Sequence, residues 1–436
     1  MFTFIKYIQP ANYYRLVDKM PKTVLVANES VEKKIGYRDD KSAIMDSAYM
    51  NLQQGLIPVA NNQRATFQNY RIDSVDDNYI FLRRYFSKFQ VCWVLILRLL
   101  SFNNPINELV GFIKSGKHKR VTLKPEEYQD YEKFQGNLVK QGPLVSVIIP
   151  TLNRYDYLKD VLCDLEQQSY KNFEVIVCDQ SEPIDEKFYE NWNINLKLIQ
   201  QEEKALWLAR NRCIKLSKGE YVLLFDDDSR VESNWIESHL KCLDYFNVKI
   251  SAGVTNTLVG GGLGKKDNYF HLSDVFDTGN AMVHHSVFHS VGLFDRQFEK
   301  QRMGDSEFGL RSLLGGFLVV SNPDAKRIHL KVDTGGLRQL GSWDAFRPKN
   351  LFSPRPIPSV LYLTRKYFGS NGAYLYILKN IPQSFVPYKY KGSKLARLVI
   401  LLLSPFWLPI AIIAVLKSWK LASDKLRQGD LIEYLT

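Results

Sequence analysis

The sequence has few cysteines and no cysteine pair of the kind that binds zinc. Only five of its 436 residues are cysteine, and they lie far apart with no C-x-x-C spacing. This excludes a zinc ribbon and argues against a disulfide-stapled scaffold, so we interpret them as reduced thiols. The N-terminus reaches its first charge at Lys6 without a long apolar core. We therefore expect no signal peptide and a chain that stays in the cytosol.

Acidic residues are in deficit, and the excess positive charge is unevenly spread. The chain has 58 lysines and arginines against 46 aspartates and glutamates, a net charge of +12. Residues 81–124 hold nine basic residues and one acid, and residues 386–436 hold eight basic residues and three acids. Both stretches border apolar runs, and no recognised nucleic-acid-binding module accompanies them. The pattern favours an anionic membrane surface over a nucleic acid as partner, with an ordinary solvated surface as the alternative.

Two apolar runs lie next to these basic stretches. The first, Val91–Leu97, ends at Arg98 and is shorter than the about 20 residues that cross a bilayer. A buried helix and an interfacial helix are equally good interpretations of it. The second, Leu398–Leu416, has no charge and would be roughly 28 Å long as a helix, with kinks expected at Pro405 and Pro409. We favour an interfacial or re-entrant helix pair there over a membrane span or a buried helix, because basic residues flank both ends.

From Pro143 onward, short β-branched runs alternate with segments of helical spacing. Strands alternating with helices predict an α/β domain with a mostly parallel sheet covered on both faces. Ligands of such sheets bind at the carboxyl ends of the strands, so polar residues that follow the strands are candidate site residues. The expected strands are 145–149, 173–178, 196–199 and 221–225, and the expected helices are 156–168, 206–216 and 232–246.

Three consecutive aspartates, Asp226 to Asp228, follow the last of these strands. Like charges at this spacing repel one another, and a divalent cation removes that cost. In an extended segment Asp226 and Asp228 point the same way and can share one ion, and carboxylate oxygens suit Mg²⁺ or Mn²⁺. The alternative is that the cluster caps the helix expected at 232–246.

Five segments in order resemble the family 2 glycosyltransferases with the GT-A fold, a Rossmann-like fold of nucleotide-diphospho-sugar transferases. They are VSVIIPTLNR (145–154), FEVIVCDQS (173–181), ARNRCIKLSKGEYVLLFDDDS (209–229), GNAMVHHSVFHSVGLFD (279–295) and GDSEFGLRSLLGG (304–316). The family includes bacterial surface-polysaccharide glycosyltransferases and galactofuranosyltransferase-like members. The resemblance implies a catalytic domain at 141–345, between an N-terminal region (1–140) of unknown role and a C-terminal helical, membrane-associating region (346–436).

The resemblance also implies roles for individual residues. Asp305 matches the general base of inverting members, while Gly304 replaces the glutamate that usually precedes it. Asp226 and Asp228 match the D-x-D motif, and His329 resembles a metal-binding histidine, so Mn²⁺ or Mg²⁺ is the implied cofactor. A structural histidine is the alternative for His329. The residues implied to bind the nucleotide sugar are Pro150, Thr151, Asn153, Asp179, Arg210 and Asp226, with Asp179 at the base.

Together these roles imply an inverting, metal-dependent enzyme. It would move a sugar from a nucleotide diphosphate, commonly UDP, to a lipid-linked or growing cell-surface glycan at the cytoplasmic face of the cell membrane. We expect no nucleic-acid partner, and a sugar-nucleotide-binding protein without catalysis is the alternative function. Three further features are weaker. His284, His285 and His289 are interpreted as structural, Gly260–Gly264 as a loop near the acceptor, and Arg338 either as closing over a diphosphate or as part of a surface turn.

Overall fold

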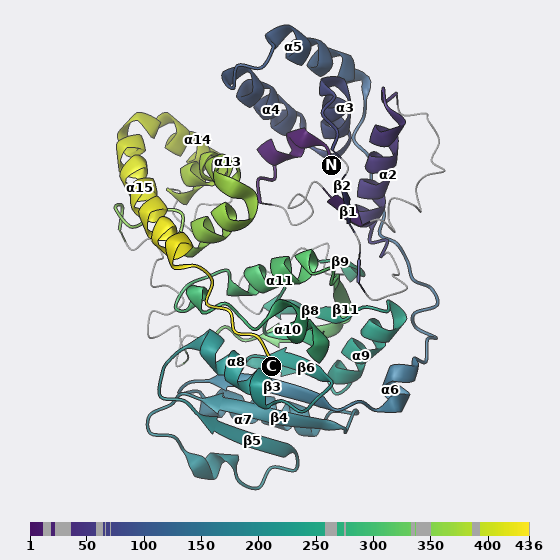
Figure 1. Cartoon of the computed structure of the whole chain (residues 1–436), viewed down its shortest axis with the longest axis vertical. Coiled ribbons are helices and arrows are strands. Elements are labelled where there is room, and N and C mark those ends of the chain that lie inside the picture. Colours follow the sequence, from purple (N-terminus) through teal and green to yellow (C-terminus); the bar gives the residue numbers. More distant parts are fainter. Residues whose placement is uncertain are drawn as a thin grey trace. The chain divides into compact units, whose positions relative to one another are not determined.

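The structure of the protein is a computed structural model. It describes residues 1–11, 19–21, 36–57, 64–65, 67–69, 71–257, 268–273, 276–332, 336, 350–385 and 393–435. Gly260–Gly264 and Arg338 lie outside the described residues. The chain forms two compact units (Figure 1). The first comprises Met1–Gln54, Thr66–Lys124 and Phe346–Gln428, and the second comprises Gly55–Ala65, Pro125–Ala345 and Gly429–Thr436.

The second unit is built on one mixed sheet, with the strand order β5-β4-β3-β6-β10-β8-β11-β7 and with β9 paired to β11. Its strands are β3 (Val145–Thr151), β4 (Phe173–Asp179), β5 (Asn195–Gln200), β6 (Tyr221–Phe225), β7 (Ser229–Val231), β8 (Ile250–Thr257), β9 (His271–Leu272), β10 (Asn280–His284) and β11 (Val319–His329). Its helices are α6 (Asn137–Gln141), α7 (Tyr155–Glu166), η4 (Glu186–Tyr189), α8 (Leu206–Leu216), α9 (Trp235–Tyr245), α10 (His285–Val291), η6 (Arg296–Phe298) and α11 (Gly304–Leu314). The strands and helices expected from the sequence are confirmed to within a few residues at their ends.

The sheet is only half parallel, which corrects the expectation of a mostly parallel one. Strands β5, β4, β3 and β6 run parallel to one another, and β11 runs parallel to β8. Strand β10 runs antiparallel between β6 and β8, and β7 and β9 run antiparallel to β11. The sequence pattern missed this half because an inserted antiparallel strand has the same local hydrophobic texture as a parallel one.

Burial explains why these segments form the centre of the sheet. Every side chain of β3, β4 and β6 is buried, as β-branched runs covered on both faces require. Helix α8 packs on β3 and β4, and α9 packs on β8, β10 and β11. Helices thus cover strands in both halves of the sheet. The carboxyl ends of β3 and β6 lie side by side.

The last residues of the chain are also part of the second unit. The Leu293 backbone N–H donates to the Glu433 carbonyl at 2.8 Å, and the Arg296 N–H donates to the Leu431 carbonyl at 3.2 Å. The Asp295 carboxylate accepts the Leu431 N–H at 3.0 Å. The chain therefore leaves the first unit after α15 and ends on the second.

The first unit consists mainly of helices. Its elements are η1 (Thr3–Tyr7), β1 (Lys19–Pro21), α2 (Asp40–Gln54), β2 (Phe67–Asn69), α3 (Val75–Tyr85), α4 (Lys88–Leu100), α5 (Pro105–Lys114), η3 (Ser115–Lys117), α13 (Pro358–Ser384, interrupted at Gly369), α14 (Lys394–Leu402) and α15 (Ser404–Gln428). Helix α13 packs against α15 and also against η1, so segments from both ends of the chain share this unit. The proposed N-terminal and C-terminal regions thus group together in space.

The uncharged segment 398–416 forms parts of two helices. Helix α14 ends at Leu402 and α15 begins at Ser404, just before Pro405, whereas Pro409 lies inside α15. The expected kink is therefore present at the first proline only. Within the described residues, Pro405–Gln428 is the one helix long and apolar enough to cross a membrane, with a mean hydropathy of 1.4. Only 22% of its most apolar stretch is buried inside the protein. The low burial is the opposite of what a core helix of a soluble protein shows.

Candidate active site

A cavity of about 540 Å³ opens at the carboxyl ends of β3 and β6. It collects side chains from distant parts of the second unit, including most of the residues singled out in the sequence. Its lining includes Pro150, Thr151, Arg154, Gln180, Trp207, Arg210, Asp226, Asp227, Asp228, Asp277, Arg302, Asp305, Arg327 and His329. Of the residues implied by the resemblance, Asn153 and Asp179 are absent from this lining.

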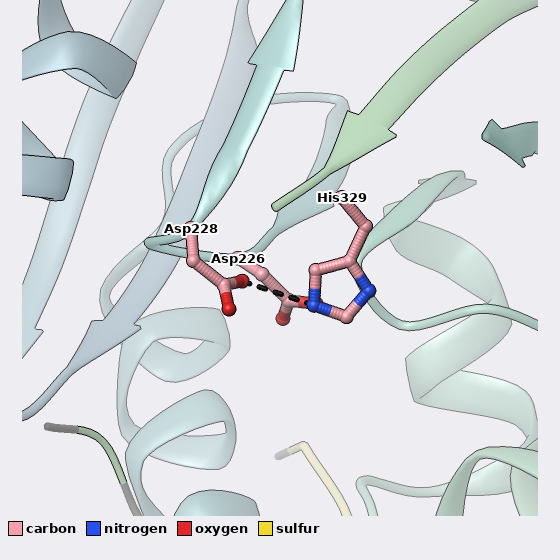
Figure 2. Close-up of side chains that lie close together, drawn as sticks. All are labelled: Asp226, Asp228 and His329. Atoms are coloured by element: carbon pink, nitrogen blue, oxygen red, sulfur yellow. Dashed lines mark ion pairs between the residues drawn. The ribbon is translucent and has the colours of Figure 1, made fainter. Parts of the chain in front are cut away.

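Asp226, Asp228 and His329 form a group able to hold a metal ion. Each offers one ligand atom, and these atoms lie within 4.8 Å of one another. Nε2 of His329 lies 3.2 Å from Oδ1 of Asp228, and Figure 2 shows the imidazole pointing at the two carboxylates. Strand pairing creates the group, because His329 at the end of β11 is the partner of Ser229 in β7, next to Asp228.

The donor set fits a divalent cation. Two carboxylates and an imidazole suit Mn²⁺ and, with water completing the shell, Mg²⁺. The capping alternative is wrong, because α9 begins after the N-cap residue Asn234, well beyond the aspartates. Among the described residues no other group of three histidines, cysteines or acids gathers in this way, and His284, His285 and His289 are not part of it.

Two arginines clamp Asp226. The Arg210 guanidinium donates to Oδ1 at 2.7 Å, and the Arg327 guanidinium donates to Oδ2 at 2.7 Å. Burial opposes ionisation of Asp226, but the two arginines outweigh it and lower the pKa of this carboxyl well below its usual value. Arg327 also donates to Asp277 at 2.9 Å, so one side chain orients two acids. Asp228 is more buried than Asp226, and Arg154 lies 3.2 Å from its Oδ2, but this oxygen has no hydrogen-bond partner among the described residues and could ligate a cation.

Asp227 lies in the turn that follows β6 and lines the same cavity, but its partners differ from those of Asp226. Its carboxylate accepts from the Thr151 hydroxyl at 2.8 Å and from the Arg154 guanidinium at 2.8 Å. Burial raises the pKa of Asp227 to about 6, although Arg154 works against this. Asp227 therefore ties the end of β6 to the end of β3 and is engaged with the protein on both oxygens.

Asp305 occupies the first turn of α11 and faces the same cavity. Its Oδ1 accepts the Ser306 backbone N–H at 2.7 Å. Burial raises the pKa of Asp305, and the negative charge of Asp277 raises it further against the pull of the Ser306 N–H and Arg210. A carboxylate with a raised pKa is a stronger proton acceptor than a solvated one, which suits a general base.

Gly304, the residue before Asp305, packs directly against the indole of Trp207. A Cβ at position 304 would lie 2.3 Å from Cζ2 of Trp207, so no side chain fits. Trp207 is 5% exposed, donates from Nε1 to the Phe298 carbonyl at 3.0 Å, and stacks near Arg210 with 5.3 Å between the guanidinium carbon and the ring centroid. The indole therefore occupies the space that a side chain at position 304 would need.

Asp179 and Asn153 lie beside the cavity and not on it. Asp179 is fully buried, and its Oδ2 accepts from the hydroxyls of Tyr155 at 2.7 Å and Tyr189 at 2.8 Å. Asn153 is exposed, and its backbone N–H donates to the Ser181 hydroxyl at 2.7 Å. Oδ1 of Asp179 accepts the Ser181 backbone N–H at 2.8 Å, so both oxygens of this buried carboxylate already have partners in the protein. The nucleotide-binding roles of both residues stay predictions.

Several cavity residues escaped the sequence reasoning. Arg327 is two positions before His329 in a strand, so the period of two places both on one face, and this signal was available. Asp277 and Trp207 gave no such signal. The position of Asp277 depends on hydrogen bonds with Arg327 of β11 and Thr255 of β8.

The comparison with known protein families decides the nature of this domain. Residues 146–288 match the family model described as Glycosyl transferase family 2. These residues form a family 2 glycosyltransferase domain. The strands β3 to β6, the aspartate cluster and β10 all fall inside the matched segment of this domain, and the mixed α/β sheet is GT-A-like, as the resemblance implied.

Curated relatives of the glycosyltransferase domain come from bacteria. Glycosyltransferase GlyA of Streptococcus pneumoniae is 28% identical over 176 residues, which are 39% of this chain and 24% of the relative. Chondroitin synthase of Escherichia coli is 28% identical over 152 residues, which are 33% of this chain and 22% of the relative. The match therefore spans about a quarter of the length of these two relatives.

A solved structure is also similar to this chain. It is that of S. aureus TarS 1–349 in complex with UDP-GlcNAc, with a TM-score of 0.45 and 16% identity. The similarity covers 65% of this chain and 92% of the TarS chain.

Proposed function

We propose that the protein is an inverting glycosyltransferase that moves a sugar from a nucleotide diphosphate sugar, most commonly UDP-linked, to a hydroxyl of a lipid-linked or growing cell-surface glycan. One observation carries the proposal. A group able to hold a metal (Asp226, Asp228 and His329) and a carboxylate with a raised pKa (Asp305) line one cavity of the unit that contains the family 2 glycosyltransferase domain. The bacterial relatives with glycosyltransferase names support the same class of reaction.

Each group has a distinct part in the proposed reaction. Asp228 and His329 would hold Mn²⁺ or Mg²⁺, which supplies the positive charge that stabilises a leaving nucleoside diphosphate. Asp226, fixed by Arg210 and Arg327, completes the site and keeps its negative charge. Asp305 accepts the proton of the acceptor hydroxyl as that oxygen attacks the anomeric carbon. Such a base contributes about 10²–10⁴-fold to the rate.

We place the enzyme at the cytoplasmic face of the cell membrane through α14 and α15. The apolar side chains of Leu402, Phe406, Ile412 and Leu416 are exposed on these helices. Helix α15 packs against α13, and its small residues Ala411, Ala414, Ser418 and Ala422 are buried. This is the arrangement of helices whose outer surface meets lipid.

A panel of nucleotide sugars tests the proposal on the purified full chain in detergent. Thermal stabilisation identifies the donor, and release of the nucleoside diphosphate in Mn²⁺, with and without a chelator, measures turnover. We expect one donor to raise the melting temperature and to turn over only with metal. Asp228→Asn should abolish both effects, whereas Asp160→Asn, at an exposed acid of α7, should change neither. A chain that binds no member of the panel, or turns over fully in chelator, would contradict the proposal.

A further inference from the structure

Helices α4 and α5 have apolar side chains on their exposed faces, and α4 also buries Val91, Val94 and Leu97. On α5, Ile106, Leu109, Val110 and Ile113 are exposed, and this is the spacing of one continuous helix stripe. The helices are joined by a short connection in which Phe102 is 98% exposed. The α4–α5 surface consists of Phe89, Ile96, Leu100, Phe102, Ile106, Leu109, Val110 and Ile113. A contiguous apolar surface of this extent marks an interaction site.

Glu108 and Arg98 of the same helices point inward, whereas Lys88 and Lys114 at the helix ends are exposed. Glu108 is 1% exposed, and it accepts from the Arg98 Nε at 3.0 Å and from the Tyr79 hydroxyl at 2.8 Å. Gly111 lies on the same inner side of α5, where a Cβ would be 3.0 Å from Asp76. Arg98 interrupts the apolar run in the sequence, but in the structure its guanidinium is paired with the buried Glu108 carboxylate. The outer face of the pair is therefore mostly apolar, with Asn107 also exposed, whereas a surface helix of a soluble protein presents a polar face to solvent.

Exposed basic residues border the α4–α5 surface. Lys88 begins α4, and Lys114 and Lys117 follow the stripe at the end of α5, with Lys119 and Arg120 beyond. The acid among residues 81–124 is Glu108, which is buried. The charge of this surface is therefore positive without an opposing acid in the segment, which complements anionic lipid headgroups more closely than a mixed-charge protein surface.

We propose that the α4–α5 surface is a second membrane-binding surface of the protein, which lies in the interfacial layer of an anionic bilayer. The apolar stripe enters the boundary between headgroups and acyl chains, and the lysines contact the headgroups. The α14–α15 pair belongs to the same compact unit, so two apolar surfaces of one unit meet the bilayer. This inference rests on the proposed membrane location but not on the transferase chemistry, which is measured separately as turnover in detergent.

Two native cysteines give a matched pair of probes. Cys92 is exposed on α4, three positions after Phe89 and four before Ile96, and thus on the outer face. Cys163 is exposed on α7 of the second unit, called the catalytic unit from here on, and the other three cysteines are buried. The full chain would carry an environment-sensitive fluorophore at Cys92 in a Cys163→Ser background, or at Cys163 in a Cys92→Ser background. Each is then reconstituted with vesicles of phosphatidylcholine and phosphatidylglycerol that contain a lipid-attached quencher.

We expect the fluorophore at Cys92 to be blue-shifted and quenched by the lipid, more strongly with phosphatidylglycerol than with phosphatidylcholine alone, and the fluorophore at Cys163 to be unaffected. Ile106→Asn with Ile113→Asn should remove the quenching at Cys92. Leu216→Asn with Leu314→Asn, at exposed leucines of the catalytic unit, should leave it unchanged.

Other results overturn the proposal. If the vesicle-bound protein shows equal quenching at Cys92 and Cys163, α14 and α15 alone contact the membrane. If Cys92 is shielded from the lipid quencher and the shielding grows with protein concentration, the surface binds a second copy of the chain. Quenching that survives the isoleucine substitutions contradicts the role of the stripe.

Discussion

Restoring the family's glutamate at position 304 should damage this enzyme. A Cβ at Gly304 would lie 2.3 Å from Cζ2 and 2.4 Å from Cε2 of Trp207, whereas carbon atoms pack at about 3.5–4.0 Å. Trp207 must therefore move by more than about 1 Å, although it is buried and held by its hydrogen bond to Phe298. Overpacking of this kind costs about 1–3 kcal/mol, and the lost hydrogen bond about 1 kcal/mol.

Gly304→Ala should thus lower the stability of the catalytic unit by about 2–4 kcal/mol, even though alanine is the better helix former. In a unit of this size the melting temperature should fall by at least about 4 °C. Gly304→Glu should be worse and should also weaken donor binding, because Arg210 stacks on Trp207 and holds Asp226. Differential scanning calorimetry and donor titration measure the two effects.

Two variants make the prediction specific. Gly116→Ala is the matched control, since nothing lies within 4 Å of a Cβ there. In a Trp207→Phe background the smaller ring vacates the space, so Gly304→Ala should cost less, with a coupling free energy of about 1–2 kcal/mol. If Gly304→Ala is as stable as the parent, or if the two substitutions are additive, the packing argument is refuted.

The remaining predictions concern the metal, the pH profile and the membrane. Asp228→Asn should weaken Mn²⁺-dependent donor binding by more than Asp227→Asn, and His329→Ala should raise the Mn²⁺ concentration needed for half-maximal turnover; equal effects of the two aspartate variants would contradict the assignment. Because the pKa of Asp305 is raised, turnover should fall on acidification at a higher pH than an ordinary aspartate with a pKa of about 4 would give, and Asp277→Asn should move this limb to lower pH; an unmoved limb contradicts the coupling. The full chain should sediment with membranes, resist extraction by high salt and be released by detergent, since salt screens charges but not apolar burial; release by salt alone would contradict apolar anchoring.

The centre of the fold could be predicted because its signals are local. Val145–Ile149 and Tyr221–Phe225 are short apolar runs that end at turn or acidic residues, and both are fully buried strands. Asp226 and Asp228 lie together as predicted, although residues 227 and 228 form a turn and not an extended segment, and Arg154 contacts both Asp227 and Asp228. These features follow from covalent geometry and hydrophobicity over a few neighbouring residues.

What could not be predicted depends on contacts between distant residues. The clamp on Asp226 needs Arg327, which lies 101 residues away and is aligned by the β8–β11 register. The fit of Gly304 against Trp207 likewise joins two helices through packing alone. Arg98 looked like a charge interrupting an apolar face, and only the hairpin with Glu108 turns it inward. Periodicity gives the face of each helix but not the partner that covers it.

The most direct test of the central claim is the effect of Asp305→Asn on transfer at saturating donor and Mn²⁺. Asparagine retains the oxygen that accepts the Ser306 N–H, so the helix start should stay intact. If Asp305 takes the acceptor proton, kcat should fall by about 10²–10⁴-fold while the Kd of the donor changes by no more than a few-fold. A kcat close to that of the parent enzyme would contradict the account.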